Sequence, residues 1–228
     1  MELNLKKEII FSERSTSLRK NNSKELLITI SPSNLKDIFI INGNSFKTEA
    51  IKKNDLLIKP NDYYMIINRG KEPIEINYSN DALHHQIIYN PYTYETSEKI
   101  NLKPEQFIEK YDVPKDYIDT LPKWYSFKFT YPEYNLIFVR PEFGLSIQIH
   151  KNRNEFWEIL DGKPIIINGN RVYYYVENGT KFQNQINTYH SVINPNKEIN
   201  KYVIIKERWN GKFDENDIKR IFNPNQYF

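Results

Sequence analysis

The sequence contains no cysteine among its 228 residues. This absence excludes disulfide bridges, cysteine-ligated zinc and thiol catalysis, and it is compatible with a reducing cytoplasm. No apolar run approaches the length of a membrane span, and the charged N-terminal segment MELNLKKEIIFSERS lacks the apolar core of a signal peptide. We therefore expect a soluble, cytoplasmic protein with no membrane partner.

An excess of charge of either sign is also missing. The chain has 32 basic and 29 acidic residues, a net charge of +3 at pH 7. The basic residues are scattered and form no nucleic-acid-binding motif, so nucleic acid is not expected as a partner. Glycine is scarce, with 7 residues, whereas there are 17 tyrosines and 13 phenylalanines. A composition of this kind favours β-strands around a folded core.

Short apolar runs separated by turn-forming residues recur in two parts of the chain and predict an all-β fold of sandwich or barrel type. The first group is Leu26–Ile30, Ile38–Ile41, Leu56–Ile58, Tyr64–Ile67 and Ile74–Tyr78. The second group is Leu136–Val139, Leu145–His150, Phe156–Leu160, Ile165–Ile167, Val172–Val176, Ser191–Ile193 and Lys201–Lys206.

Two further segments, one between the two groups of predicted strands and one after the second group, have a different pattern. Residues 81–132 contain a short helical pattern after Pro104, with Phe107 and Tyr111 among its apolar positions, and are expected to form a connector on the barrel surface. Residues 214–222 begin with acidic and end with basic side chains, which predicts a short final helix.

The two β-rich parts contain the same short sequence motifs in the same order. Ile40–Asn44 reads IINGN and Ile166–Asn170 reads IINGN, and the later runs Met65–Asn68 and Ser191–Asn194 also correspond. This recurrence predicts an internal duplication. The alignment places Tyr64 opposite His190 and Lys20 opposite His150, so the first copy is expected to be structural.

The stretch from Leu145 to Gly162, LSIQIHKNRNEFWEILDG, carries the chemistry. Its alternation predicts a strand that presents Gln148 and His150 on one face, followed by Glu155 on a second strand. His190 lies near a second strand end, and His84 and His85 lie in a loop and are expected to be solvated. Imidazole and carboxylate together suit a site for zinc, manganese, iron or nickel.

The motif Gln148-x-His150-x-x-Arg153-x-Glu155-x-Trp157 resembles the first motif of the cupin superfamily, in the form found in the cupin domain of type II mannose-6-phosphate isomerases. Glu177–Gly179 with His190–Pro195 resembles the second cupin motif, and Glu215–Arg220 resembles the closing segment of those isomerases. The resemblance implies a cupin β-barrel (jelly roll) and, with the duplication, a bicupin. The domains would be a degenerate cupin-like unit at residues 1–80, a connector at 81–132 and a cupin domain at 133–228.

The resemblance also implies a site. The metal ligands would be His150, Glu155 and His190, with Asn152 as a weak fourth ligand where the family has histidine. The cofactor would be a divalent metal (Zn, Mn or Fe), and the substrate a sugar or sugar phosphate undergoing aldose–ketose isomerisation. Gln148, Arg153, Trp157 and Arg220 would bind substrate, while no residue stands out as the catalytic base.

Two other hypotheses remain open. The chain could be a non-catalytic bicupin that binds a carbohydrate or a protein and has lost its metal, or an iron-dependent oxygenase. Two barrels in one chain could also pack as an internal pseudo-dimer, and a homodimer stays open.

Overall fold

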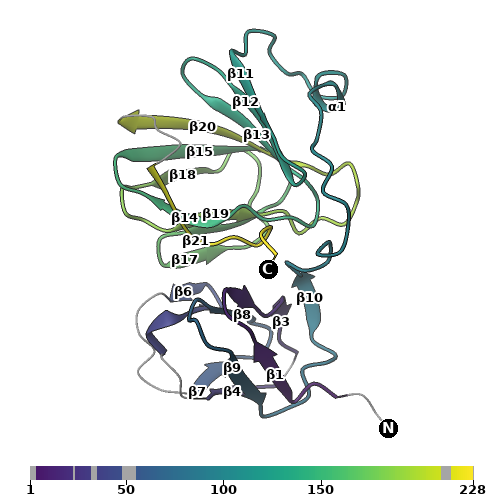
Figure 1. Ribbon diagram of the computed structural model, residues 1–228, viewed down its shortest axis with the longest axis vertical. Helices are drawn as coiled ribbons and strands as arrows, with labels where there is room; N and C mark the ends of the chain where they lie inside the picture. Colours follow the sequence, from purple (N-terminus) through teal and green to yellow (C-terminus); the bar gives the residue numbers. More distant parts are fainter. Residues whose placement is uncertain (1–3, 23, 32–34, 48–54, 212–216, 228) are drawn as a thin grey trace. The chain divides into compact units, whose positions relative to one another are not determined.

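The computed structural model describes residues 4–22, 24–31, 35–47, 55–211 and 217–227. The chain divides into two compact units, Met1–Asn90 with Asn170–Val172, and Pro91–Gly169 with Tyr173–Phe228. Both are built almost entirely from strands, which confirms the all-β prediction (Figure 1). No helix in these described ranges is long and apolar enough to cross a membrane.

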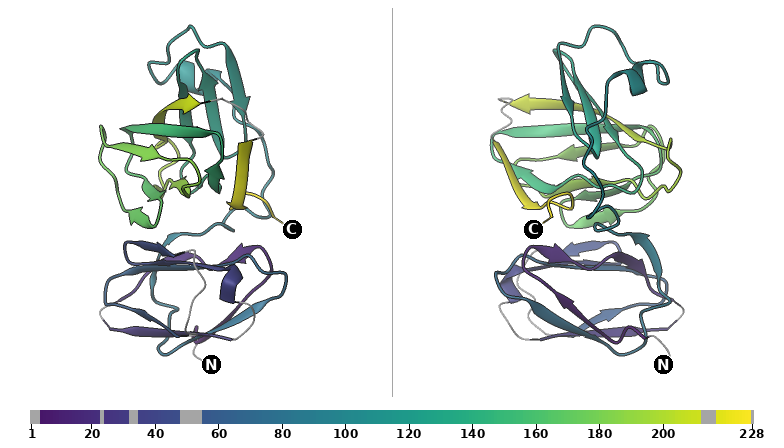
Figure 2. Two further views of the ribbon diagram at one scale, coloured as in Figure 1. Left: turned by 90° about the vertical axis from the view of Figure 1, so that its left-hand side faces the viewer. Right: turned by 45° about the vertical axis from the view of Figure 1, so that its right-hand side comes forward.

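The first unit encloses its core between two sheets (Figure 2). One sheet has the order β1-β9-β4-β7, and the other runs β10-β3-β8-β5-β6, with β2 also paired to β8. The alternation that the sequence showed in β4 places Leu26 and Ile28 in the core and leaves Leu27 exposed. The strands are β1 (Lys7–Ile10), β2 (Arg14–Ser15), β3 (Leu18–Lys20), β4 (Leu26–Ile30), β5 (Ile38–Asn42), β6 (Ser45–Lys47), β7 (Asp55–Ile58), β8 (Tyr63–Asn68), β9 (Ile74–Tyr78) and β10 (Gln86–Tyr89), with the 3₁₀ helix η1 (Leu35–Asp37) before β5.

The second unit has the same two-layered plan. A six-stranded sheet, β11-β12-β13-β20-β15-β18, faces a sheet with the order β16-β19-β14-β21 (Figure 1). Its strands are β11 (Asp119–Pro122), β12 (Ser126–Thr130), β13 (Asn135–Val139), β14 (Ile147–His150), β15 (Arg153–Asp161), β16 (Ile165–Asn168), β18 (Lys181–Asn184), β19 (His190–Ile193), β20 (Val203–Gly211) and β21 (Ile218–Phe222). Strand β17 (Arg171–Tyr173) follows β16, and its first two residues belong to the first unit. In β15 the period of two turns Arg153, Glu155, Trp157 and Ile159 inward, so one strand carries both core and polar side chains into the barrel.

The expected connector, residues 81–132, contributes to both units. Strand β10 pairs with β3 in the first unit, whereas β11 and β12 extend the six-stranded sheet of the second. The helix after Pro104 forms as α1 (Glu105–Ile108). It is anchored by Phe107, whose ring centroid lies 5.0 Å from that of Phe127 and 4.6 Å from that of Phe138.

The internal duplication appears in the strand registers. Asn42 pairs with Tyr64 and Ile41 with Met65 in the first unit, as Asn168 pairs with His190 and Ile167 with Ser191 in the second. The turn glycines after the two asparagines have φ of 55° and 61°. Each asparagine side chain donates to a carbonyl, Asn42 to that of Leu57 and Asn168 to that of Gln183. The two units are therefore copies of one barrel.

These registers locate the counterparts of the predicted ligands in the first unit. Tyr64 corresponds to His190, as predicted, but it pairs with Arg19 where His190 pairs with Gln148. The counterpart of His150 is therefore Asn21, one residue beyond the predicted Lys20. Leu26, opposite Ile58, stands where Glu155 stands opposite Asn184.

The C-terminal segment differs from its prediction. The predicted helix at 214–222 lies partly outside the described residues, and Ile218–Phe222 is strand β21. It pairs with β14 through Gln148–Arg220 and His150–Ile218. The acidic-to-basic order of charges suited the dipole of a helix. The backbone groups on one side of β14 would lack hydrogen-bond partners without β21, and this favours the strand over the helix.

Candidate metal centre

The three predicted ligands come from strands of both sheets in the second unit. His150 ends β14 and His190 begins β19 in one sheet, and Glu155 projects from β15 in the other. Each side chain is only 1% exposed. The inward face of each strand delivers its residue, so the period-two pattern read from the sequence assembles the cluster.

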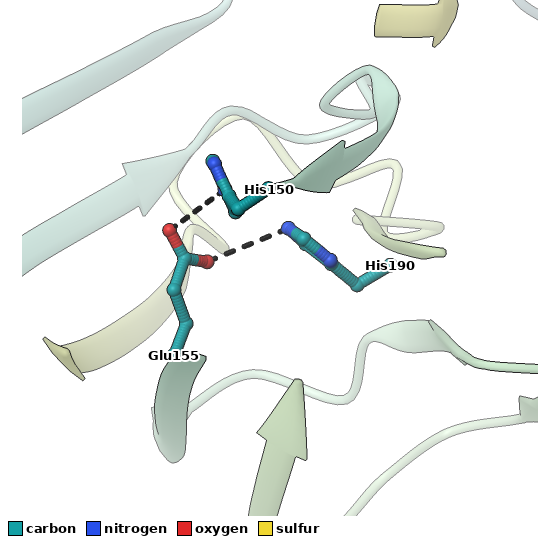
Figure 3. Close-up of side chains that lie close together, drawn as sticks. All are labelled: His150, Glu155 and His190. Atoms are coloured by element: carbon teal, nitrogen blue, oxygen red, sulfur yellow. Dashed lines mark ion pairs between the residues drawn. The ribbon is translucent and has the colours of Figure 1, made fainter. Parts of the chain in front are cut away.

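The carboxylate of Glu155 faces both imidazoles from one side (Figure 3). Its Oε1 is 2.9 Å from Nε2 of His150, and its Oε2 is 3.5 Å from Nε2 of His190. The two imidazole rings stack with centroids 5.0 Å apart. Ligand atoms of all three residues lie within 4.8 Å of one another, a spacing that one metal ion can bridge.

Protonation within the cluster suits metal ligation. Burial opposes ionisation of Glu155, but the hydrogen bond from His150 and the electrostatic attraction of the two imidazoles and of Arg153 outweigh it and lower its pKa to about 2. Burial lowers the pKa of His190. At neutral pH the cluster therefore offers a carboxylate and a neutral imidazole, the forms that bind metals.

The His190 ring has a defined orientation. Its Nδ1 lies 2.9 Å from the carbonyl oxygen of Thr188, so the neutral ring donates its proton there and keeps a lone pair on Nε2. That lone pair faces Oε2 of Glu155, which is buried without a hydrogen-bond partner. Two acceptors facing each other in a buried site require a cation or proton between them, and the donor set fits a divalent metal.

Arg153 lies inside this cluster. Its guanidinium donates from Nε to Oε1 of Glu155 at 3.0 Å, and its Nη2 is 3.4 Å from Nε2 of His150. The side chain is 3% exposed. Its observed role is to orient Glu155, which leaves Oε2 as the carboxylate oxygen available to an ion.

Gln148 and Asn152 are placed on different sides of the cluster. The Gln148 amide nitrogen is 3.5 Å from Nε2 of His190, and its oxygen accepts a hydrogen bond from Ser146. The Asn152 side chain is exposed and donates from Nδ2 to Asp217 at 3.0 Å. The side-chain amide next to the ligands is therefore that of Gln148 and not that of Asn152.

A pocket opens beside the cluster, with a cavity of about 90 Å³, enough for several water molecules. Trp157 forms a wall: its side chain is buried and meets the His190 ring edge-on, with centroids 5.4 Å apart. Arg220, an exposed residue of β21, also lines the pocket. The lining comprises Leu121, Lys123, Tyr125, Ser126, Lys128, Ile137, Leu145, Ser146, Gln148, Arg153, Glu155, Trp157, Glu207, Ile218 and Arg220.

Sequence reasoning missed several of these residues. Glu207 continues the inward alternation of Val203 and Ile205 along β20, so an acidic residue on an apolar strand face was the available signal. Lys128 alternates with the buried Phe127 and Phe129 in β12. The segment that holds Lys128 was predicted to be a connector, and this prediction concealed its position in the barrel.

The histidine pair of the first unit also differs from expectation. His84 is exposed, as predicted, but His85 is 4% exposed and its Nδ1 lies 2.8 Å from the Tyr64 hydroxyl. Nearby, Arg19 and Tyr78 both donate to Glu8, at 3.1 and 2.8 Å. These hydrogen bonds lie in the first unit around Tyr64, the counterpart of His190.

Comparison with known proteins identifies the second unit. Residues 127–223 match the family model described as mannose-6-phosphate isomerase C-terminal. The second unit is therefore similar to the cupin domain of this family. Since the first unit repeats its registers, the chain is a bicupin. No curated protein sequence matches the chain.

Solved structures match the chain only weakly. An oxalate decarboxylase–formate complex from Lactobacillus farciminis is 10% identical over 96% of this chain and 77% of that one, with a TM-score of 0.39. The capsular polysaccharide assembling protein CapF of Staphylococcus aureus is 14% identical over 55% of this chain and 34% of CapF, with a TM-score of 0.35. A variant of Streptomyces PAC13 with uridine is 11% identical over 49% of this chain and 93% of that one, with a TM-score of 0.36. Similarities of this size carry no argument about activity.

Proposed function

We propose that this bicupin is a metal-dependent enzyme that isomerises a sugar or sugar phosphate between its aldose and ketose forms. One observation carries the proposal: the lone pair of His190 and the unpartnered oxygen of Glu155 face each other at 3.5 Å in a buried site. The family match at residues 127–223 supports the choice of a sugar phosphate.

The proposed role of each residue follows from its position in the site. His150, Glu155 and His190 would hold the ion, with the Gln148 amide beside them, and zinc, manganese or iron suits this donor set. When bound, the metal supplies Lewis-acid polarisation of a carbonyl or hydroxyl oxygen.

The substrate would contact the pocket lining. Lys123 and Arg220 are cationic lining residues that can attract a phosphate group, and Arg220 can bind it bidentately. Trp157 gives the sugar an apolar wall, and Gln148 can orient a hydroxyl group. Arg153 is occupied by Glu155 and acts by holding that ligand in place.

The decisive test is metal analysis of protein purified without a histidine tag and soaked with Zn²⁺ or Mn²⁺. We expect close to one equivalent in the wild type, and a loss of most of it in His190→Ala because one of three protein ligands is removed. His84→Ala, which removes an exposed histidine of the first unit, is the matched control and should leave the metal content unchanged.

Less than about a tenth of an equivalent in soaked wild type would contradict the proposal. If metal binds, conversion of mannose 6-phosphate to fructose 6-phosphate tests the reaction itself. A metal-loaded protein that does not convert this substrate would contradict the isomerase assignment and leave the metal site standing.

A non-catalytic carbohydrate-binding bicupin is the second candidate. It is favoured by Arg153, because a guanidinium 3.0 Å from Glu155 and 3.4 Å from His150 already supplies a cation to the cluster. In that case His150→Ala would leave sugar binding intact in a folded, metal-free protein.

A further inference from the structure

The pocket contains a second acidic residue that the metal cluster does not use. Glu155 and Glu207 are the two carboxyl groups among the residues that line it. Both oxygens of Glu155 face the cluster, Oε1 toward His150 and Arg153 and Oε2 toward His190. Glu207 is outside that set of contacts, so a role in ligation does not account for it.

We propose that Glu207 is the proton-transfer residue of this pocket, a carboxyl group that takes a proton from a bound sugar and returns it to the neighbouring carbon. The proposal rests on the proposed function and supplies the base that sequence reasoning did not identify.

The two hydrogen-bond donors to Glu207 are uncharged and held in place. Asn135 donates to its Oε1 at 2.8 Å, and the indole of Trp157 donates to its Oε2 at 3.1 Å. Strand β20 is paired on both sides, to Asn135 through β13 and to Trp157 through β15, so the carboxyl group cannot drift. A carboxyl group held by neutral donors keeps both protonation states accessible, unlike one paired to a cation.

Three charged groups in the pocket also act on Glu207. Burial is the largest effect, and with the negative charge of Glu155 it raises the Glu207 pKa to about 8, while Lys128 on β12 and Arg153 on β15 act in the opposite direction. A pKa near the working pH lets one group act as base and then as acid. A cation in the cluster would offset the charge of Glu155 and bring this pKa down.

The fold itself does not require an acid at this position. The pair Trp157–Glu207 in the second unit corresponds to Ile28–Tyr78 in the first. Tyr78 satisfies its hydroxyl by donating to Glu8 at 2.8 Å. The same strand position holds a tyrosine in the first barrel, so folding of the barrel does not require a carboxyl group there. We therefore attribute the carboxyl group of Glu207 to a function of the pocket.

The chemical step balances with Glu207 alone as the proton carrier on carbon. The carboxylate takes the proton from the carbon next to the aldehyde, and the C–H electron pair forms the carbon–carbon double bond of an enediolate. The hydroxyl proton then moves from the second oxygen to the first. Glu207 returns its proton to the first carbon as the ketone forms at the second.

The first measurement is the exchange of the substrate C–H proton with solvent deuterium, using mannose 6-phosphate and metal-loaded protein. Glu207→Gln keeps the size and an acceptor oxygen, and we expect it to lower exchange and turnover at least ~100-fold with metal content and sugar-phosphate affinity unchanged. Glu158→Gln, on the outer face of β15, is the control and should behave as wild type.

The second measurement follows the protonated-carboxyl infrared band of the metal-free protein across pH. We expect a band that disappears near pH 8 in wild type and is absent from Glu207→Gln. Trp157→Phe removes one donor to the carboxylate and should move the midpoint to higher pH. This variant keeps the carboxyl group and serves if Glu207→Gln does not fold.

The outcomes separate the two proposals. Exchange at the wild-type rate in folded Glu207→Gln overturns the role of Glu207 and leaves the isomerase standing. A wild type that neither exchanges nor isomerises overturns the proposed function, and a titrating band then still assigns the proton-holding group to Glu207. A carboxyl group that stays ionised from pH 5 to 9 overturns the role of Glu207.

Discussion

At the scale of single residues, the direction of a side chain decides its chemistry more than its place in a motif. Asn152 lies two residues after His150, yet its amide is bound to Asp217. Gln148 lies two residues before His150, and the pairing of β14 with β19 brings its amide to 3.5 Å from His190. The presence of asparagine at position 152, where the resembling family has histidine, is therefore compatible with metal binding by the other residues.

A pair of variants tests this placement. We expect Gln148→Ala to weaken metal binding about 10-fold, because it removes a polar group next to a ligand. Asn152→His should change the affinity little, since its side chain would start from the exposed side near Asp217. Competition with a chelator measures both, and a marked gain in affinity for Asn152→His would show that position 152 reaches the ion.

At the scale of elements, β21 completes the site from the far end of the chain. Asp217, just before β21, accepts hydrogen bonds from the backbone nitrogens of Lys151 and Asn152, at 3.1 and 3.0 Å. These bonds fix the turn that joins β14 to β15 and therefore the spacing of His150 from Glu155. The charge pattern of the segment could not reveal this, because pairing with β14 is a long-range contact.

Loss of that carboxylate should loosen the turn. We expect Asp217→Ala to destabilise the protein by about 1–3 kcal/mol, because it removes the three hydrogen bonds that the carboxylate accepts from Lys151 and Asn152, and also to weaken metal binding. Urea denaturation and metal titration measure the two effects. Asp119→Ala, at an exposed aspartate in β11, is the control, and equal stability of the two variants would contradict this role.

At the scale of the whole molecule, one barrel has been copied, and within the described part of the chain the proposed ligand set lies in the second copy. Asn21, Leu26 and Tyr64 stand at the ligand positions of the first unit, and leucine cannot bind a metal. We therefore expect one metal ion per chain, removed completely by His150→Ala. Two equivalents in wild type, or a residual equivalent in the variant, would contradict this division.

The features that could be predicted from the sequence are those that leave a local pattern, either an alternation of apolar residues or a repeated motif. The strands, the duplication and the cluster of His150 with Glu155 and His190 followed from alternation and motif spacing. The inward position of Glu207 and the strand state of Ile218–Phe222 depended on which strands pair across long sequence separations. Pairing of that kind leaves little trace in a single strand.

The cluster also joins the two layers of its barrel. His150 and His190 belong to one sheet of the second barrel and Glu155 to the other, so an ion held by all three would fasten the two layers together from inside. The barrel could not part its layers without first releasing that ion. Metal binding would then reduce local opening of the second barrel. The first barrel is held by its own hydrogen bonds, so its local opening would not depend on metal.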